Sequence, residues 1–244
     1  MIYIGDRKVG KTHLALELAN PINQCVAVDK LPYQKIDKKT MGLRGTDARK
    51  GVYDTYFEVK VHLPVGEKTI ITNWLDTTGE IWRQSWQSDK PDEWRDFIAH
   101  LQEAEGILLI LAPYREILDP NLLDYQDFIT RQQWINRFER WVRFFQQYCL
   151  KIEHLLICLN KADLFCQNLQ QEAKKLAYDP NYQQMTWQQK DQYVYHRYFR
   201  PIHSYIQELN RSIEGLSVRC FITSVDSREL LELPWIYLGS YLAQ

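Results

Sequence analysis

The sequence lacks an excess of charge of either sign. Its 30 lysine and arginine residues stand against 31 aspartate and glutamate residues, which gives the 244-residue chain a formal net charge of -1. Nucleic acids and anionic membrane surfaces are bound mainly through excess positive charge. The charge balance therefore gives no reason to expect either as the main partner, and we expect no nucleic-acid ligand.

Long apolar runs are also missing. The longest, Gly106 to Pro113, has the length of one strand, whereas a membrane-spanning helix needs about 20 residues. The first residues run straight into Gly5 without a signal-peptide pattern, and neither end fits a lipidation signal. We therefore expect a cytoplasmic protein without an autonomous membrane anchor.

Cysteine and histidine are few and scattered. No two of the five cysteines have CxxC spacing, and the six histidines form no HExxH arrangement. The sequence therefore suggests neither a disulfide framework nor a zinc site. Cys158 and Cys220 lie in apolar runs, and we expect them to be reduced core residues.

Short apolar runs alternate with longer amphipathic stretches, which is typical of an α/β fold with a mainly parallel sheet. Strands are predicted over residues 2–4, 53–63, 69–75, 107–111, 154–159 and 218–222. A turn from Pro64 to Glu67 joins the second and third of these, which indicates an antiparallel hairpin. Helices are predicted over 11–18, 92–105, 127–150 and 186–210. The last of these carries Thr186 and Gln189 as a capping box, and Pro234 is expected to open a short final helix.

The most informative segment lies after the first predicted strand and is called here the phosphate loop. It runs Gly5-Asp6-Arg7-Lys8-Val9-Gly10-Lys11-Thr12 and matches G-x-x-x-x-G-K-[ST]. The two glycines let successive backbone N–H groups turn inward toward a phosphate, and the following helix adds its positive end. Lys11 can reach the β- and γ-phosphates, and the Thr12 hydroxyl can bind Mg²⁺.

Asp76-Thr77-Thr78-Gly79 stands at the end of the third predicted strand. A D-x-x-G pattern is common by chance, but this one leaves a sheet edge downstream of a phosphate loop. Asp76 can hold the hydration shell of Mg²⁺, and the Gly79 N–H can reach a γ-phosphate.

Two further polar motifs follow the last two predicted strands. The first, Asn160-Lys161-Ala162-Asp163, provides a carboxylate that can accept two hydrogen bonds, from N1–H and the exocyclic amine of guanine. Adenine has no such pair of donors. Asn160 can brace the base and the phosphate loop, and the Lys161 stem can pack over the purine. The second motif, Thr223-Ser224-Val225, can present backbone N–H groups to the base oxygen.

In order and placement, these motifs resemble the Ras-like branch of the translation-factor-related P-loop GTPases, over residues 2–224. The resemblance implies a three-layer P-loop sheet, mostly parallel with one antiparallel strand. It also implies binding of Mg²⁺ with GTP or GDP, and a switch between these two states. All four motifs lie at the carboxyl ends of strands, where open α/β sheets bind ligands.

The family closes a switch threonine onto Mg²⁺ and the γ-phosphate. Thr40, Thr46 and Thr55 compete for this role. Thr46 is preferred because it lies in a predicted loop, and a switch residue must be mobile. Thr55 has a spacing to Asp76 closer to that of small family members, but it falls in a predicted strand.

The predicted catalytic residues are Lys11, Glu80 and Arg7. Glu80 stands where many family members carry the glutamine that orients the attacking water, and its negative charge is unfavourable near a γ-phosphate. Arg7 either excludes a catalytic group by its bulk or itself neutralises charge in the transition state. Either way, the expectation is slow hydrolysis.

We expect a single GTPase domain over residues 1–244, with a helical insertion at about 164–215. The short first strand and short last helix are also consistent with an excerpt from a longer protein. The aromatic residues of the insertion either pack on the sheet or form a docking surface for a protein effector or neighbouring domain.

Two other functions compete with a slow GTPase. One is a GTP-binding scaffold that does not hydrolyse GTP, and Glu80 and Arg7 are the residues that support this alternative. The other is a P-loop ATPase or nucleoside kinase, which leaves Asn160 to Asp163 without an explanation.

Overall fold

One mixed sheet forms the centre of the molecule. A computed structural model describes residues 1–6, 8–20, 25–29, 53–76, 84–122, 125–181 and 183–242. Within these ranges, seven strands pair in the order β2-β3-β4-β1-β5-β6-β7. Strand β3 is antiparallel to β2 and β4, and the other neighbours are parallel. This confirms a mostly parallel sheet with one antiparallel strand. The strands are β1 (Ile2–Gly5), β2 (Val26–Asp29), β3 (Tyr53–Leu63), β4 (Gly66–Asp76), β5 (Gly106–Leu111), β6 (His154–Leu159) and β7 (Ser217–Ile222).

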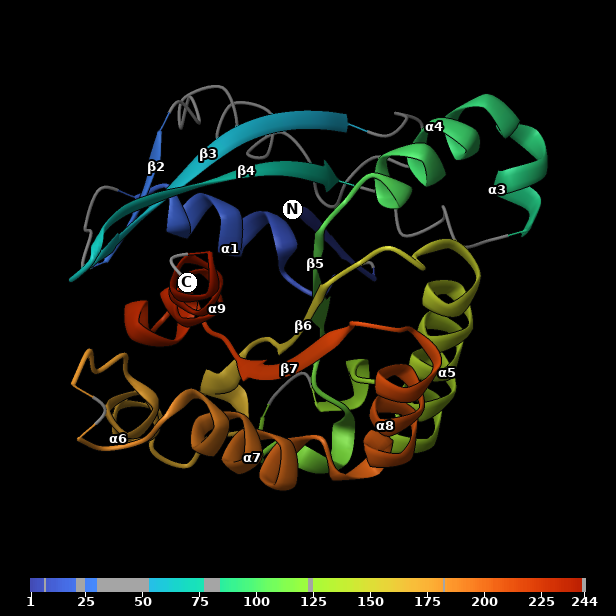
Figure 1. The fold of residues 1–244 in the computed structure, drawn as a ribbon. Helices are drawn as coiled ribbons and strands as arrows, with labels where there is room; N and C mark the ends of the chain where they lie inside the picture. The colour runs from blue at the N-terminus through green and yellow to red at the C-terminus, as the bar shows by residue number, and fades with distance from the viewer. Residues whose placement is uncertain are drawn as a thin grey trace.

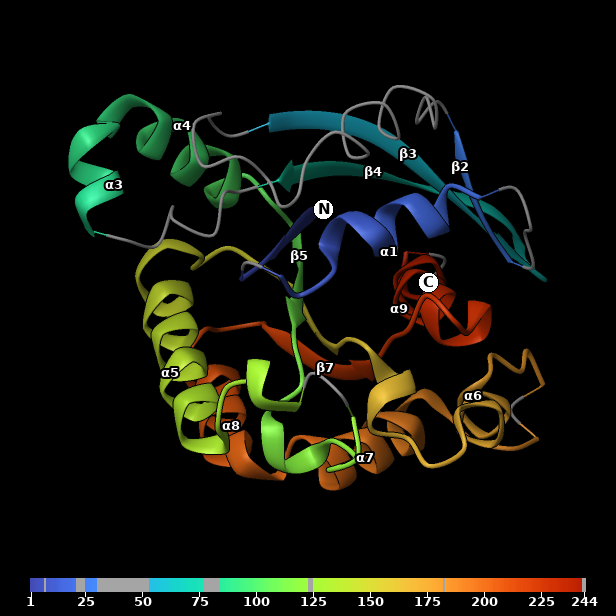
Figure 2. The same cartoon turned by 180° about the vertical axis from the view of Figure 1, so that it is seen from behind.

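Helices cover both faces of the sheet and complete a three-layer α/β arrangement. Helices α1 and α9 lie on one face, α4, α5 and α8 lie on the other, and α7 runs beside the edge strand β7 (Figure 1). Figure 2 shows the same layers from behind. The helices are α1 (Lys11–Leu18), α3 (Gln84–Asp89), α4 (Pro91–Gln102), α5 (Arg131–Tyr148), α6 (Leu169–Leu176), α7 (Trp187–Tyr198), α8 (His203–Ser212) and α9 (Arg228–Tyr241), with 3₁₀ turns η1 (Arg115–Ile117), η2 (Tyr125–Asp127), η3 (Ala162–Leu164) and η4 (Arg200–Ile202).

The burial of the strands follows from these layers. Every residue of β1, β5 and β6 is buried, because helices cover both sides of the central strands. Such strands have continuous apolar sequences rather than alternating ones. Strand β3 alternates instead, with Phe57, Val59 and Val61 buried and Glu58 and His62 exposed. One face of the β3–β4 hairpin therefore faces the core and the other faces water.

Two sequence predictions for the strands need correction. Strand β2 was not predicted, since its four residues are too few for a clear pattern. Its backbone pairs with β3, with Val26 opposite Val61. Strand β4 also begins earlier than predicted, because the hairpin turn contains only Pro64 and Val65 and Leu63 already pairs with Gly66.

The helix predictions also need correction toward the end of the chain. The predicted helix over 186–210 is interrupted by η4, where Pro201 lacks the N–H that would continue it. Its start is confirmed, because Thr186 and Gln189 form the capping box. Pro234 does not open the last helix but lies inside α9, whose N-cap is Ser227. The segment after residue 164, predicted only as the start of a helical insertion, contains α6.

All five cysteines are free, and Cys158 and Cys220 are buried in the core as predicted. Among the residues that the structure describes, no helix is long and apolar enough to span a membrane.

Candidate functional site

The phosphate loop joins β1 to α1, and its two glycines are required by their surroundings. A Cβ atom on Gly5 would lie 2.3 Å from the carbonyl oxygen of Ile110 in the neighbouring strand. Gly10 has φ +92°, and a Cβ atom there would lie 2.6 Å from Nδ2 of Asn160. The first glycine therefore allows close packing of backbones, and the second allows a left-handed turn before α1.

The Lys11 side chain folds back over this loop. Its Nζ donates hydrogen bonds to the carbonyl oxygens of Gly5 and Asp6, both at 2.9 Å, and the residue is only 6% exposed. The Tyr3 hydroxyl donates to the Lys11 carbonyl at 3.1 Å. The ammonium group is thus held within the loop, where a phosphate would be bound.

Helix α5 supplies neighbours of the phosphate loop that the sequence alone did not reveal. Burial raises the pKa of Asp6, while Arg137, Lys11 and Arg140 and a hydrogen bond from the Trp141 side chain act in the opposite direction. The loop position and α5 are far apart in the chain, and no motif links them. A cleft of about 1220 Å³ runs along the same face, and its lining includes Asp6, Arg137 and Arg140.

A single amide connects the phosphate loop with the motifs after β6 and β7. Nδ2 of Asn160 donates to the Val9 carbonyl at 2.8 Å, across 151 positions of sequence. Its Oδ1 accepts a hydrogen bond from the Thr223 hydroxyl at 3.2 Å. Asn160 is 3% exposed, so breaking these bonds would leave polar groups buried without partners.

The base loop, which we define as Asn160 to Cys166, is also fixed at Asp163. The Ser224 hydroxyl donates to Oδ1 of Asp163 at 2.5 Å, and the backbone N–H of Asp226 donates to the Ser224 hydroxyl at 3.1 Å. The motif after β7 therefore orients the carboxylate of the motif after β6.

Lys161 has a left-handed backbone conformation, with φ 63° and ψ 46°. Its Nζ lies 5.3 Å from the centroid of the Phe128 ring. Burial lowers the pKa of Lys161, with Asp163 raising it and Lys8 lowering it further. Lys8 is exposed and, like Lys161, has a positive φ. Both cations line the cleft that also contains Asp6.

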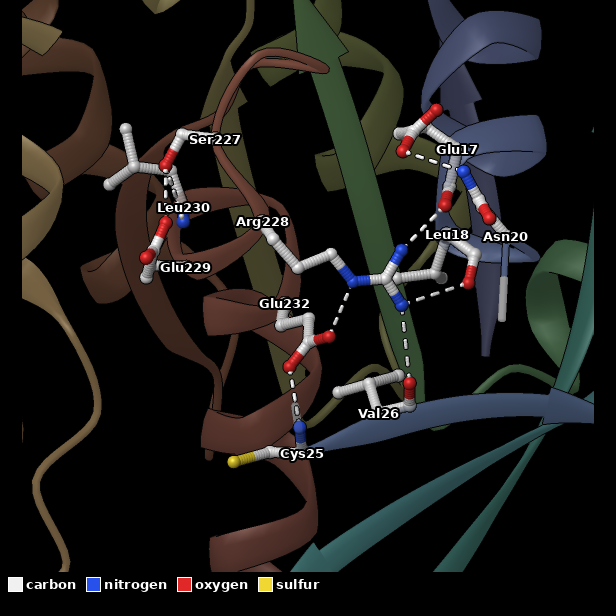
Figure 3. Close-up of polar contacts among 10 residues, drawn as sticks. All are labelled: Glu17, Leu18, Asn20, Cys25, Val26, Ser227, Arg228, Glu229, Leu230 and Glu232. Carbon is white, nitrogen blue, oxygen red and sulfur yellow. Dashed lines mark hydrogen bonds and ion pairs between the residues drawn. The ribbon is translucent and has the colours of Figure 1, made fainter. Parts of the chain in front are cut away.

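A buried ion pair in α9 holds the far end of the phosphate-loop helix (Figure 3). The Arg228 guanidinium donates to the carbonyl oxygens of Glu17 and Leu18 at the end of α1, at 2.5 and 3.1 Å. It also donates to Glu232 at 2.5 Å, which in turn accepts from the Cys25 N–H at 2.8 Å. A cation at the carboxyl end of a helix is favourable, so α9 fixes where α1 ends and where β2 begins.

Several predicted site residues lie outside the described residues, namely Arg7, Thr40, Thr46, Gly79 and Glu80. Asp76 is the last residue of β4, but its side chain is not among those described. Thr55 belongs to β3, as predicted. Thr12 is half-buried in the first turn of α1, and Val225 is exposed beside buried Ser224.

The residues present fit a Mg²⁺ ion held jointly with a nucleotide. The described ranges contain no cluster of three or more histidine, cysteine, aspartate or glutamate side chains. Mg²⁺ needs no such cluster when phosphates and waters complete its shell. Thr12 offers a hydroxyl oxygen at the start of α1, next to Lys11.

The sheet order, with the phosphate loop after β1 and polar motifs at the carboxyl ends of β4, β6 and β7, defines a three-layer α/β fold of the P-loop type. No protein-family model matches the sequence, and no curated protein matches it. Among solved structures, one similar chain comes from the signal recognition particle receptor SRb-GTP/SRX complex of Chaetomium thermophilum. It has 14% identity and a TM-score of 0.48, over 98% of this chain and 96% of that chain.

Proposed function

We propose that this protein is a Mg²⁺-dependent guanine-nucleotide-binding switch that hydrolyses GTP slowly to GDP and phosphate. One observation carries the proposal: the Asn160 side chain bonds both to Val9 in the phosphate loop and to Thr223 after β7. A candidate phosphate-binding segment and a candidate base-binding segment would thus form one continuous site at the carboxyl ends of the strands, the usual ligand position in such sheets.

The phosphate end of the site has the chemistry that a nucleoside triphosphate needs. Backbone N–H groups from Gly5 to Thr12 and the positive end of α1 would surround the phosphates. Lys11 would neutralise the β- and γ-phosphates after leaving its two carbonyl acceptors. Mg²⁺ would be held by Thr12, Asp76 and Thr46 together with phosphate oxygens, and the Gly79 N–H would meet the γ-phosphate. The metal supplies charge neutralisation during phosphoryl transfer.

The base end of the site favours guanine over adenine. Asp163 is held by Ser224, so its carboxylate would meet the two donors of guanine with little loss of side-chain freedom. The Lys161 stem would cover one face of the purine, and backbone N–H groups of Ser224 and Val225 would meet the base oxygen.

Slow hydrolysis is proposed from the residues at positions 7 and 80. A glutamate near the γ-phosphate is a poor substitute for a neutral water-orienting side chain, and Arg7 is bulky for a phosphate loop. The scaffold alternative differs only in the absence of hydrolysis. Measurement of phosphate release by the purified protein, with and without candidate activator proteins, separates the two.

A GTP/GDP switch acts by binding a partner differently in its GTP-bound and GDP-bound states. We therefore propose a protein effector or neighbouring domain as the partner.

Competition binding of GTP, GDP and ATP in the presence of Mg²⁺ tests the base assignment. We expect the wild type to prefer guanine nucleotides, and Asp163→Asn to reduce that preference by about 100-fold or more, because a charge-assisted bidentate contact is lost. Asp226→Asn is the matched control. Asp226 lies in the neighbouring turn and is exposed, and only its backbone N–H contacts Ser224 in the site, so selectivity should stay unchanged.

Equal or tighter binding of ATP by the wild type would contradict the proposal. Unchanged selectivity in Asp163→Asn would also contradict it and would favour a P-loop ATPase or nucleoside kinase.

A further inference from the structure

Six described aromatic residues of the helical insertion face the body of the protein. Tyr198 and Phe199 are buried, and Tyr178, Trp187, Tyr193 and Tyr195 are half-buried against the core. Packing, rather than a free docking surface, therefore accounts for these six side chains.

A buried carboxylate organises one end of α7. Oε1 of Glu172, in α6, accepts hydrogen bonds from the hydroxyls of Tyr198 at 2.6 Å and Tyr193 at 2.7 Å. Arg197 lies 3.6 Å from the same oxygen. A charged group is buried at acceptable cost only when hydrogen bonds and opposite charge compensate it. Burial, followed by the bond to Glu172, raises the pKa of Tyr193 to about 12, so this phenol stays a donor at neutral pH.

Of these two tyrosines, Tyr198 makes direct contacts with the base loop. The Tyr198 hydroxyl lies 3.5 Å from Sγ of Cys166, and its ring meets the Phe165 ring edge-on at 5.3 Å between centroids. The Cys166 N–H donates to the Ala162 carbonyl at 2.9 Å, which closes the turn containing Asp163. Tyr198 thus contacts the base loop just beyond the carboxylate proposed to bind guanine.

The same helix also contacts the strand that leads to Ser224. Oδ1 of Asp191, in α7, accepts a hydrogen bond from the backbone N–H of Cys220 at 2.8 Å. Strand β7 is the edge of the sheet, so this carboxylate satisfies a donor that has no strand partner. Helix α7 therefore touches both segments that meet in the bond between Ser224 and Asp163.

We propose that α7 positions the guanine-binding carboxylate, with Tyr198 and Glu172 as positioning residues for base selectivity. The inference rests on the proposed function and assigns the insertion a role in it. One helix holds the base loop through Tyr198 and the edge strand through Asp191. The distance between Asp163 and Ser224 therefore depends on α7 remaining docked.

The test compares GDP with IDP, whose hypoxanthine base keeps N1–H but lacks the exocyclic amine. We define the ratio as the dissociation constant of IDP divided by that of GDP. It reports on the second hydrogen bond to Asp163 and is independent of the phosphates that the two ligands share. Tyr198→Phe should lower this ratio by about fivefold or more, the effect of weakening one hydrogen bond to a charged group. Tyr193→Phe is the matched control, because it removes a hydroxyl from the same helix and the same acceptor but leaves the contact between Tyr198 and Cys166 in place.

A second variant approaches the contact from the base loop. Cys166→Ala removes the thiol but leaves Tyr198 bonded to Glu172, and it should lower the ratio in the same direction. Cys166→Ser, which keeps a polar hydrogen-bonding atom, should restore the ratio toward the wild-type value. A merely structural role would lower the melting temperature of the variants while leaving the ratio unchanged.

The outcomes separate this inference from the proposed function. If the wild type prefers GDP over ADP but Tyr198→Phe and Cys166→Ala change the ratio no more than Tyr193→Phe does, α7 has no positioning role. If the wild type shows no preference for GDP over ADP, the proposed function fails and the inference fails with it.

Discussion

Arg228→Met should strongly destabilise the protein, because the substitution breaks a buried ion pair and leaves its partner in place. The side chains of Arg228 and Glu232 are 11% and 1% exposed, and the atoms Nε and Oε1 lie 2.5 Å apart. The same guanidinium donates to three backbone carbonyls, those of Glu17, Leu18 and Val26. Methionine fills much of the space of the arginine stem but donates nothing.

The expected cost follows from what remains buried. Removing one partner of a buried pair costs about 3–5 kcal/mol, because the other charge is left uncompensated. We expect a loss of about 4 kcal/mol, which is a large part of the 5–15 kcal/mol that typically stabilises a domain. Glu232→Met by itself should cost about 2 kcal/mol or more, because it leaves the Arg228 charge buried and removes the acceptor of the Cys25 N–H. Removing both charges in Arg228→Met/Glu232→Met should cost no more than Arg228→Met alone, so the coupling free energy should be at least about 2 kcal/mol.

Urea unfolding of the wild type, both single variants and the double variant measures this coupling, with tryptophan fluorescence and far-UV circular dichroism as independent probes. Arg228→Lys is a useful companion, since it keeps the charge but loses the planar fork of donors and should be intermediate. Additive free-energy changes in the two single variants, or a loss below about 1 kcal/mol in Arg228→Met, would refute the reasoning.

Two further predictions concern the phosphate loop and a buried histidine. Gly10→Ala should cost about 1–3 kcal/mol of stability through its left-handed backbone and should also lower GDP affinity by about tenfold or more, because its methyl group would meet Asn160. Gly66→Ala, whose φ is also positive but which has open space around it, should leave GDP affinity unchanged in the same titration, and equal losses of affinity in both variants would contradict the argument. Burial lowers the pKa of His154, with Arg219 acting in the same direction and Glu153 and Glu105 acting against it. The folded state therefore binds fewer protons, and stability is full above pH 6.5 and falls as the pH drops toward the lowered pKa. Urea unfolding at several pH values should show a weaker pH dependence in His154→Gln, and equal slopes would exclude this histidine as the cause.

The parts of the fold that were predictable have local causes. Residues close together in sequence determine the phosphate loop, the strands of the central sheet and the capping box of α7. They do so through their backbone conformation or through the spacing of apolar residues along the chain. Strand β2 was missed because its four residues have no motif beside them, whereas the equally short β1 is followed by the phosphate loop. Pro234 was misassigned because its preference for the first turn of a helix is a local rule, whereas Ser227 and the packing of α9 against the sheet determined where the helix begins.

The candidate site likewise has features with local causes in the sequence and features that depend on long-range contacts. Gly5, Gly10, Lys11, Asn160 and Asp163 could be predicted as phosphate- and guanine-binding residues, because their types and spacings are those that this chemistry requires. How these residues are held could not be predicted from the sequence and follows from the tertiary structure. The bond from Asn160 to Val9, the ion pair of α9 at the end of α1, and the contacts of α7 with the base loop and with β7 all join segments that are distant in sequence. No periodicity records such pairs, since they form only when the packing of helices on the sheet brings their side chains together.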